Sequence, residues 1–203
     1  MNVIYVIETI KKDEELVKKL MEFCDIEIYP NEKKPEDMKG AMIYNIDGIA
    51  FACDGSGGEY ILLSDNTIGF SSSEGECGRI AENITELFEL QLNCSGFMNY
   101  LFIDLYKDDE LMERYITKME NDSEKWFNEH KGNYKNMQKE LLGKLSIRKY
   151  DSLIELLKRF HKTANRDPKY YYTCTEENGN KIESGGCIID TPLYDRVKKR
   201  MGL

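Results

Sequence analysis

Short apolar runs alternate with turn residues over positions 41–71, which is the pattern of an antiparallel β-meander. The Asp47-Gly48 pair favours a tight type I′ hairpin between the first two runs. A glycine-rich stretch at 54–59 and a polar triplet at 64–66 separate the later runs. The pattern therefore predicts four paired strands, at 41–46, 49–53, 60–63 and 67–71.

Residues 9–24 place apolar side chains at the spacing of one helical face, and either Thr9 or Asp13 is a suitable N-cap. The polar stretch 25–39 contains two prolines and predicts a connecting loop. A short strand at 26–29 is compatible with that loop.

Helical periodicity returns after residue 81. The segment 97–106 is apolar on nearly all sides, which predicts a buried helix. Ser152 and Glu155 form a capping-box pattern at the start of the last helix. The predicted helices cover residues 82–93, 97–106, 109–120, 123–130, 134–146 and 151–163.

A second hairpin signal lies near the C-terminus, where Asn178-Gly179 separates a tyrosine-rich run from residues 180–183. Together these elements predict an α+β fold with an antiparallel β-meander sheet packed against helices. A mainly helical C-terminal extension would end in a terminal β-hairpin. We expect residues 1–107 to form the α+β core and residues 108–203 to pack on it as one unit.

The composition is that of a folded globular protein, with 41% apolar and 32% charged residues among 203. No apolar run approaches the roughly 20 residues of a membrane helix, and the first residues do not form a signal peptide. A cytoplasmic protein is therefore expected. The net charge of −9 argues against general binding to nucleic acid or anionic lipid.

The charge is distributed unevenly along the chain. Residues 1–110 carry 23 acids and 9 bases, whereas residues 111–203 carry 14 acids and 19 bases. The basic residues between 148 and 169 lie near several tyrosines, a mixture that can mark a nucleic-acid groove, although a solvated helix face explains them more simply. The basic half could also neutralise the acidic half within the fold.

Neither a metal nor a cofactor is expected from the sequence. None of the six cysteines forms a C-x-x-C pair, and only two histidines are present, which favours free thiols in a reducing cytosol. The glycine-rich turn 54–59 lacks the Walker and EF-hand spacings, so its glycines are expected to serve a wide hairpin loop. A hydrolase would need His130 or His161 as its base, and the sequence contains no nucleophile elbow.

Acidic residues on the predicted turns are the main functional signal. Almost no base lies near them, and turns of a rigid sheet often carry binding surfaces. Such a surface would attract a protein partner with a basic site, although acids on turns also serve solubility. The candidate partner-binding residues are Asp54, Glu59, Asp65, Glu74 and Glu76, with Tyr60 as a further candidate.

The segment 47–94 resembles the central stretch of the SUKH superfamily, the Smi/Knr-type immunity proteins. The shared features are a strand ending in a small residue and Asp-Gly, a Gly-Gly-acid turn, an apolar strand opened by tyrosine, a Gly-aromatic strand and an Ile-Ala step before a helix. In this chain they are Ala52 to Gly55, Gly57 to Glu59, Tyr60 to Leu63, Gly69-Phe70 and Ile80-Ala81. The family's usual Leu-Pro and aromatic segment is not evident, and residues 108–203 have no counterpart in the resemblance.

The resemblance implies an α+β fold with a helix-backed antiparallel sheet and no enzymatic activity. Many members are immunity proteins that neutralise a polymorphic toxin, often a nuclease, and others serve as scaffolds. We therefore expect a non-catalytic intracellular binding protein, in the first place an immunity protein that contacts its toxin through an acidic surface. A regulatory scaffold without a toxin partner and, less favoured, a hydrolase are the alternatives.

Overall fold

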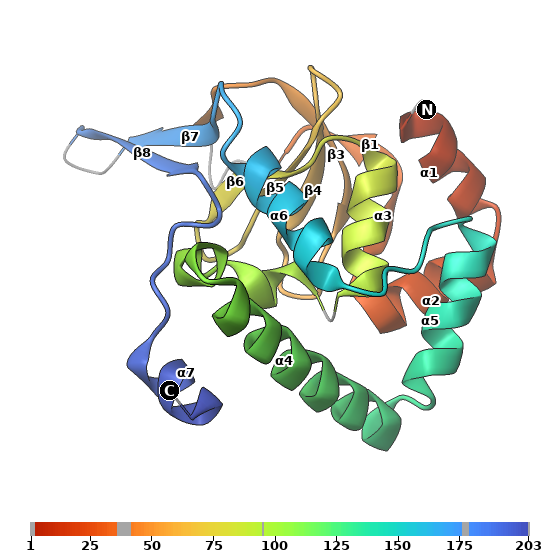
Figure 1. Ribbon diagram of the computed structural model, residues 1–203. Helices are drawn as coiled ribbons and strands as arrows, with labels where there is room; N and C mark the ends of the chain where they lie inside the picture. The colour runs from red at the N-terminus through yellow and green to blue at the C-terminus, as the bar shows by residue number, and fades with distance from the viewer. Residues whose placement is uncertain (1–2, 36–41, 95, 176–178, 203) are drawn as a thin grey trace.

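Two antiparallel sheets and the helices around them make up the computed structural model, which describes residues 3–35, 42–94, 96–175 and 179–202 (Figure 1). The predicted α+β class is confirmed. No described helix combines the length and the apolar composition that a membrane span requires.

The larger sheet contains three of the four predicted meander strands, at 49–53, 60–63 and 67–71, with one further strand at each edge. Its five strands follow the order β1-β3-β4-β5-β6, and every neighbouring pair is antiparallel. The edge strand β6 is not among the predicted strands, and β1 is longer than the short strand predicted at 26–29. The bounds are β1 (Glu27–Lys33), β3 (Gly48–Cys53), β4 (Glu59–Leu63), β5 (Ile68–Ser71) and β6 (Cys77–Ala81).

The smaller sheet corrects the predicted hairpin at Asp47-Gly48. Strand β2 (Met42–Tyr44) does not pair with β3, because β1 and β4 already occupy the two edges of β3. It pairs instead with β7 (Tyr170–Thr175), which forms the predicted terminal hairpin with β8 (Lys181–Gly186). The Asn45 side chain fixes this arrangement, because it donates to Lys169 O and accepts from Tyr171 N.

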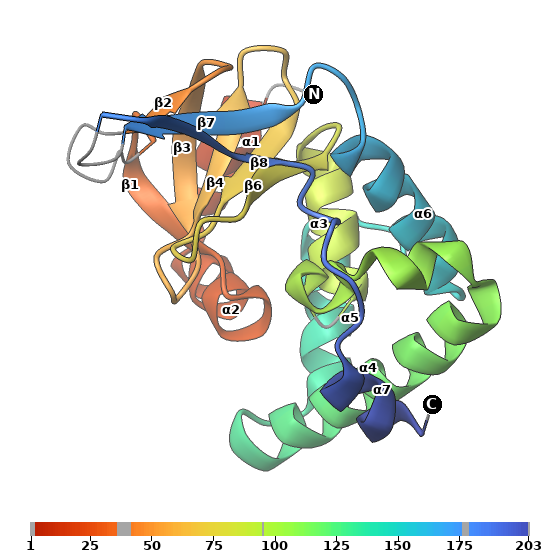
Figure 2. The same cartoon turned by 90° about the vertical axis from the view of Figure 1, so that its left-hand side faces the viewer.

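The three-stranded sheet covers one face of the meander, and helices cover the other (Figures 1 and 2). Ile61, Leu63 and Tyr170 are buried between the sheets, whereas Tyr60 and Phe70 belong to the core under the helices. Strand alternation therefore gives β4 two buried faces. Helix α6 packs on β6, and β2 pairs with β7, so residues 1–107 and 108–203 contribute to common layers.

Several predicted helices have different boundaries in the structure. The segment 9–24 divides into two helices at Asp13, which accepts a capping hydrogen bond from Leu16 N at 2.9 Å. The helices predicted at 109–120 and 123–130 form one continuous helix. Two short 3₁₀ helices replace the helix predicted at 97–106, and Ser152 occupies an N-cap position without a side-chain capping bond.

The helices have the following bounds: α1 (Val3–Lys11), α2 (Glu14–Cys24), α3 (Ile84–Asn93), η2 (Phe97–Tyr100), η3 (Ile103–Lys107), α4 (Asp109–His130), α5 (Tyr134–Lys144), α6 (Leu153–Ala164) and α7 (Asp195–Met201). The long helix α4 runs below the sheet layers in Figure 1, and α7 packs near its beginning. The chain therefore returns to α4 near its C-terminus through a short helix.

Gly69 allows the two sheets to approach each other. A Cβ atom at this position would lie 2.7 Å from Cε1 of Tyr170, which is fully buried. We expect Gly69→Ala to lower the free energy of unfolding by about 1–3 kcal/mol, because the added methyl group overpacks this contact. Urea denaturation followed by circular dichroism measures the change.

Gly143 provides the matched control for this substitution. It lies in α5, and a Cβ atom there would meet no heavy atom within 4 Å. Gly143→Ala should therefore raise stability by up to about 1 kcal/mol through helix propensity. Equal stability of the two variants would contradict the role given to Gly69.

Candidate functional site

The predicted partner-binding residues lie at two opposite ends of the five-stranded sheet. The β3–β4 and β5–β6 turns, which hold Asp54, Glu74 and Glu76, share one end, beside α2 (Figure 2). The β4–β5 turn, which holds Asp65, lies at the other end because consecutive turns of a meander alternate. Asp65 therefore does not share a surface with the other candidates.

Asp65 serves as the counter-ion of a buried arginine. Its carboxylate lies 2.9 Å from Nη2 of Arg79, whose side chain is 1% exposed. Arg79 also donates to the Thr67 hydroxyl and, through Nε and Nη2, to the carbonyl of Pro168. Burial opposes the ionisation of Asp65, but hydrogen bonds from Thr67 and the charge of Arg79 hold its pKa below the usual value.

Glu59 and Tyr60 are buried rather than exposed on the turn. Glu59 is 4% exposed, accepts a hydrogen bond from the Tyr29 hydroxyl at 3.0 Å and lies 3.1 Å from Lys33 Nζ. Tyr60 is 2% exposed, and its hydroxyl accepts from Gln91 Nε2 at 2.8 Å. These two residues support the site from within and do not present free side chains to a partner.

The remaining candidates form part of a larger group of carboxylates, which we call the acidic end. Asp25 follows α2, where it adopts a left-handed conformation, and Glu27 begins β1 opposite Cys53. Both residues therefore lie beside the β3–β4 turn. The acidic end consists of Asp25, Glu27, Asp54, Glu74 and Glu76, of which all but the half-buried Asp54 are exposed.

None of these five carboxylates forms an ion pair with a described lysine, arginine or histidine. Lys33 is a cation close to this end of the sheet. Burial raises the pKa of Cys53, and the charge of Lys33 opposes that change, but the Lys33 ammonium group itself contacts Glu59 and the ring of Tyr29. The two turns are spaced by roughly two strand separations, about 10 Å. Their carboxylates therefore add up to a local negative potential that no described basic side chain neutralises through an ion pair.

Hydrogen bonds within the turns hold the acidic end in a fixed shape. Asp54 Oδ1 accepts from Ser56 N, Ser56 Oγ and Gly58 N at 2.7–2.9 Å. The Ser72 hydroxyl bonds the Glu76 carboxylate and accepts from the backbone N–H of Glu76 at 3.0 Å. A rigid surface loses less conformational entropy on binding than a mobile loop would.

Elsewhere, the acidic and basic halves of the sequence neutralise each other within the fold. Arg159 pairs with Glu89 at 2.7 Å and with Glu86 at 3.7 Å. Arg166 binds Glu82, and Lys144 lies 3.1 Å from Asp13. The two halves of the sequence therefore do pair with each other, and among the residues that the structure describes these pairs do not reach the acidic end.

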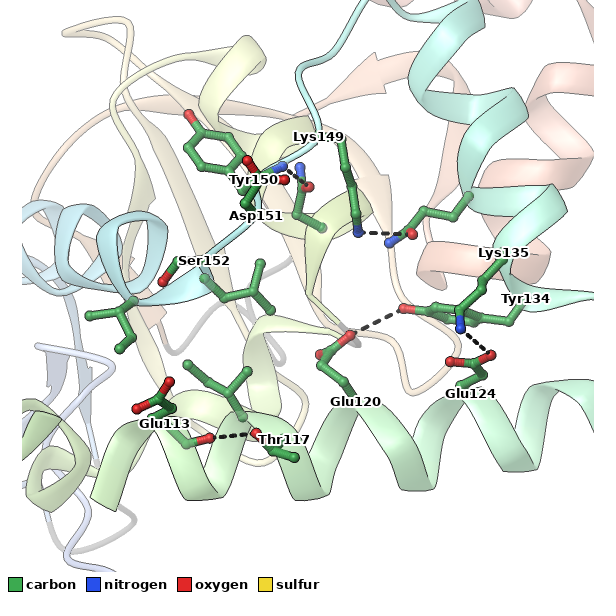
Figure 3. A pocket seen from close by; sticks show the side chains of 15 residues that line it. Glu113, Thr117, Glu120, Glu124, Tyr134, Lys135, Lys149, Tyr150, Asp151 and Ser152 are labelled. Carbon is green, nitrogen blue, oxygen red and sulfur yellow. Dashed lines mark hydrogen bonds and ion pairs between the residues drawn. The ribbon is translucent and has the colours of Figure 1, made fainter. Parts of the chain in front are cut away.

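A separate cleft of about 540 Å³ lies between α4, α5 and the start of α6 (Figure 3). Glu120 accepts hydrogen bonds from the hydroxyls of Tyr100 and Tyr134, and Lys149 donates to Gln138 at 2.9 Å. Desolvation lowers the pKa of Lys149, while the charge of Glu120 opposes that change. The cleft presents both signs of charge. Of the described hydroxyl residues that line it, Thr117 donates to the Glu113 carbonyl oxygen, and Ser152 shows no hydrogen bond to a side-chain base.

The two histidines do not form a nucleophile–base pair among the described residues. His130 stacks on Trp126, and its Nδ1 lies 2.7 Å from the Trp126 carbonyl oxygen. His161 stacks on Tyr106 at 4.5 Å, and burial lowers its pKa. This geometry gives no support to the hydrolase alternative.

The part of the chain that the structure describes contains no cluster of three His, Cys, Asp or Glu residues suited to a metal ion. All six cysteines are free thiols. Comparisons with family models, with curated proteins and with solved structures found no match for this chain. The site must therefore be judged on its own geometry.

Asp65 and Glu74 offer a direct contrast between a structural carboxylate and a surface carboxylate. Asp65→Asn keeps the size of the side chain but removes the counter-ion of buried Arg79. We expect a loss of about 1–3 kcal/mol in the free energy of unfolding. The exposed variant Glu74→Gln should stay within about 0.5 kcal/mol. Urea denaturation distinguishes them, and identical midpoints would contradict the assignment of Asp65.

The stability that Asp65 contributes should depend on pH, because the pKa of Asp65 is lowered in the folded protein. A carboxyl group whose pKa is lower in the folded state stabilises the fold above its unfolded pKa, and this contribution disappears as the pH falls through the folded value. The stability difference between the wild type and Asp65→Asn should therefore be largest near about pH 7 and shrink toward about pH 3. Urea titrations across this range measure it, and a difference that grows on acidification would exclude the assignment.

Proposed function

We propose that this protein is a non-catalytic binding protein whose acidic end contacts a basic site on a protein partner. The observation that carries the proposal is the group of five carboxylates without an ion pair among the described residues. Three of them lie on two hydrogen-bonded turns of the sheet, and the other two lie beside the β3–β4 turn. Charges of one sign on such a surface accelerate association with an oppositely charged partner and disfavour acidic competitors.

The more specific proposal is an immunity protein that blocks a toxin, with a nuclease as the favoured class. Nucleases hold phosphate groups with cationic side chains, and a rigid set of carboxylates can occupy the same cations. The resemblance of residues 47–94 to the SUKH superfamily supports this choice. The α+β fold, with its antiparallel sheet backed by helices, is compatible with that resemblance.

A regulatory scaffold remains the second candidate, because it would use the same acidic surface for a partner that is not toxic. Both functions suit a cytoplasmic location, and the six free thiols favour a reducing compartment. Growth inhibition by the partner distinguishes the two functions.

The test uses the genes that neighbour this one. Each neighbouring product is expressed alone and together with this chain, and growth is measured. We expect one product to arrest growth and co-expression to restore it.

The triple variant Asp54→Asn, Glu74→Gln, Glu76→Gln should weaken binding of the purified partner by about tenfold or more at low salt, because each charge contributes about 0.5–1 kcal/mol. Calorimetry at low and high salt measures this effect.

The triple variant Glu110→Gln, Glu129→Gln, Glu155→Gln is the matched control, because it removes the same charge from exposed helical positions. It should bind like the wild type. Equal weakening by both triple variants would mean that net charge alone matters and that the acidic end is not the contact surface. A neighbouring product that binds without arresting growth would favour the scaffold.

A further inference from the structure

A small pocket opens at the acidic end, where the end of α2, the β3–β4 turn, α3 and η2 meet. Its volume is about 220 Å³, below the roughly 300–1,000 Å³ of sites for drug-sized ligands. This volume suits a single side chain. The residues that line it are Phe23, Cys24, Asp25, Asp54, Tyr60, Gln91, Gly96, Phe97, Met98 and Asn99.

Two carboxylates and no basic residue line the pocket. Asp25 lies close to the β3–β4 turn, since a Cβ atom on Gly55 would be 2.8 Å from Asp25 Oδ1. Burial raises the pKa of Tyr60 well above its usual value, and the charges of Asp54 and Asp25 act in the same direction. Both carboxylates therefore project negative potential into the pocket.

Gln91 provides an independent sign of a missing polar partner. It lines the pocket, is 2% exposed and donates through Nε2 to the Tyr60 hydroxyl. Its Oε1 is buried and has no hydrogen-bond partner among the described residues. A buried amide oxygen without a partner costs free energy, so a hydrogen-bond donor that enters here would be favoured.

Aromatic rings complete the lining. Tyr60 and Phe97 pack with their centroids 6.4 Å apart and nearly perpendicular planes, and Phe23 lies at the α2 side. Aromatic faces attract cations, and a guanidinium group stacks on them more readily than an ammonium group. Acidic groups, an amide acceptor and aromatic walls together favour a planar cation that carries several donors.

We propose that this pocket receives the guanidinium group of one arginine side chain from the protein partner. The inference rests on the proposed function, because it assigns one specific contact within the acidic end. Asp25 and Asp54 would neutralise the charge, Gln91 Oε1 would accept one N–H, and the half-buried ring of Phe23 would offer a face to the plane of the group. Glu74 and Glu76, on the neighbouring turn, would attract the partner without entering the pocket.

The experiment titrates the ¹⁵N-labelled full chain with N-acetyl-arginine amide and follows backbone amide shifts. We expect saturable shifts in residues 24–26, 54–58, 91 and 96–99, which surround the pocket. N-acetyl-lysine amide should bind more weakly, and N-acetyl-glutamine amide should produce no saturable shift. Calcium and magnesium chloride serve as further probes, and saturation by either metal at the same residues without a response to arginine would overturn the proposal.

Matched double variants separate the pocket from the general field of the acidic end. Asp25→Asn with Asp54→Asn should weaken arginine-amide binding by about fivefold or more, whereas Glu74→Gln with Glu76→Gln should change it by less than about twofold. Asparagine tolerates the left-handed backbone of position 25, where φ is 55°. Unchanged far-ultraviolet circular dichroism verifies that both double variants fold.

The same double variants show whether the pocket or the proposed function fails. Partner binding that survives Asp25→Asn with Asp54→Asn but is lost with Glu74→Gln and Glu76→Gln would overturn the pocket and leave the acidic end as the contact surface. Partner binding that survives both double variants would overturn the proposed function, whatever the arginine probe shows. Equal loss of arginine-amide binding in both double variants would mean that the general negative charge of the acidic end attracts arginine. That result would overturn the proposed pocket.

Discussion

The burial of the Arg79 guanidinium is the constraint on which the arrangement of the two sheets depends. A buried guanidinium group must be neutralised, and its donors must find acceptors. Asp65 and Thr67 meet part of this requirement from the neighbouring β4–β5 turn, and the carbonyl of Pro168 meets the rest. Pro168 lies between α6 and β7, so the network fixes the place where the second half of the chain returns to the meander. Strand β7 then presents Tyr170 to Gly69 and offers its free edge to β2.

The same constraint determines which carboxylates remain available at the surface. Asp65 pairs with Arg79. Arg159 of α6 pairs with Glu86 and Glu89, and Arg166, which follows α6, pairs with Glu82. These ion pairs lie beside β6 and at the end of the five-stranded sheet that holds the β4–β5 turn. The opposite end receives no such cations from the described residues. The uneven charge of the sequence therefore becomes a localised acidic end only after the second half has docked.

The sequence predicts strands β3, β4 and β5, helix α3 and the terminal hairpin, because their signals are local: apolar runs, helical spacing and an Asn-Gly turn. It cannot predict the partner of β2, since the Asp47-Gly48 signal does not reveal that β1 occupies the edge of β3.

Asp54, Glu74 and Glu76 can be predicted as surface acids from their turns. Asp25 cannot, because it joins them through the fold from a position before β1. Glu59 and Asp65 look equivalent to the others in sequence, and only the contacts with Tyr29, Lys33 and Arg79 distinguish them.

The features that carry the family resemblance and the features that would contact a partner occupy different parts of the sheet. Tyr60 and Phe70 are core residues, and Gly69 is required by the close approach of Tyr170. These positions specify a fold, so they favour a class of protein without indicating what it binds. The carboxylates of the acidic end, by contrast, belong to neither hydrophobic core cluster, and those of Asp54 and Glu76 bond within their own turns. Substitutions there can alter the preferred partner while the Arg79 network and both layers of the core remain intact. Tyr60 connects the two parts, because its ring belongs to the core while its hydroxyl positions Gln91 beside Asp25 and Asp54.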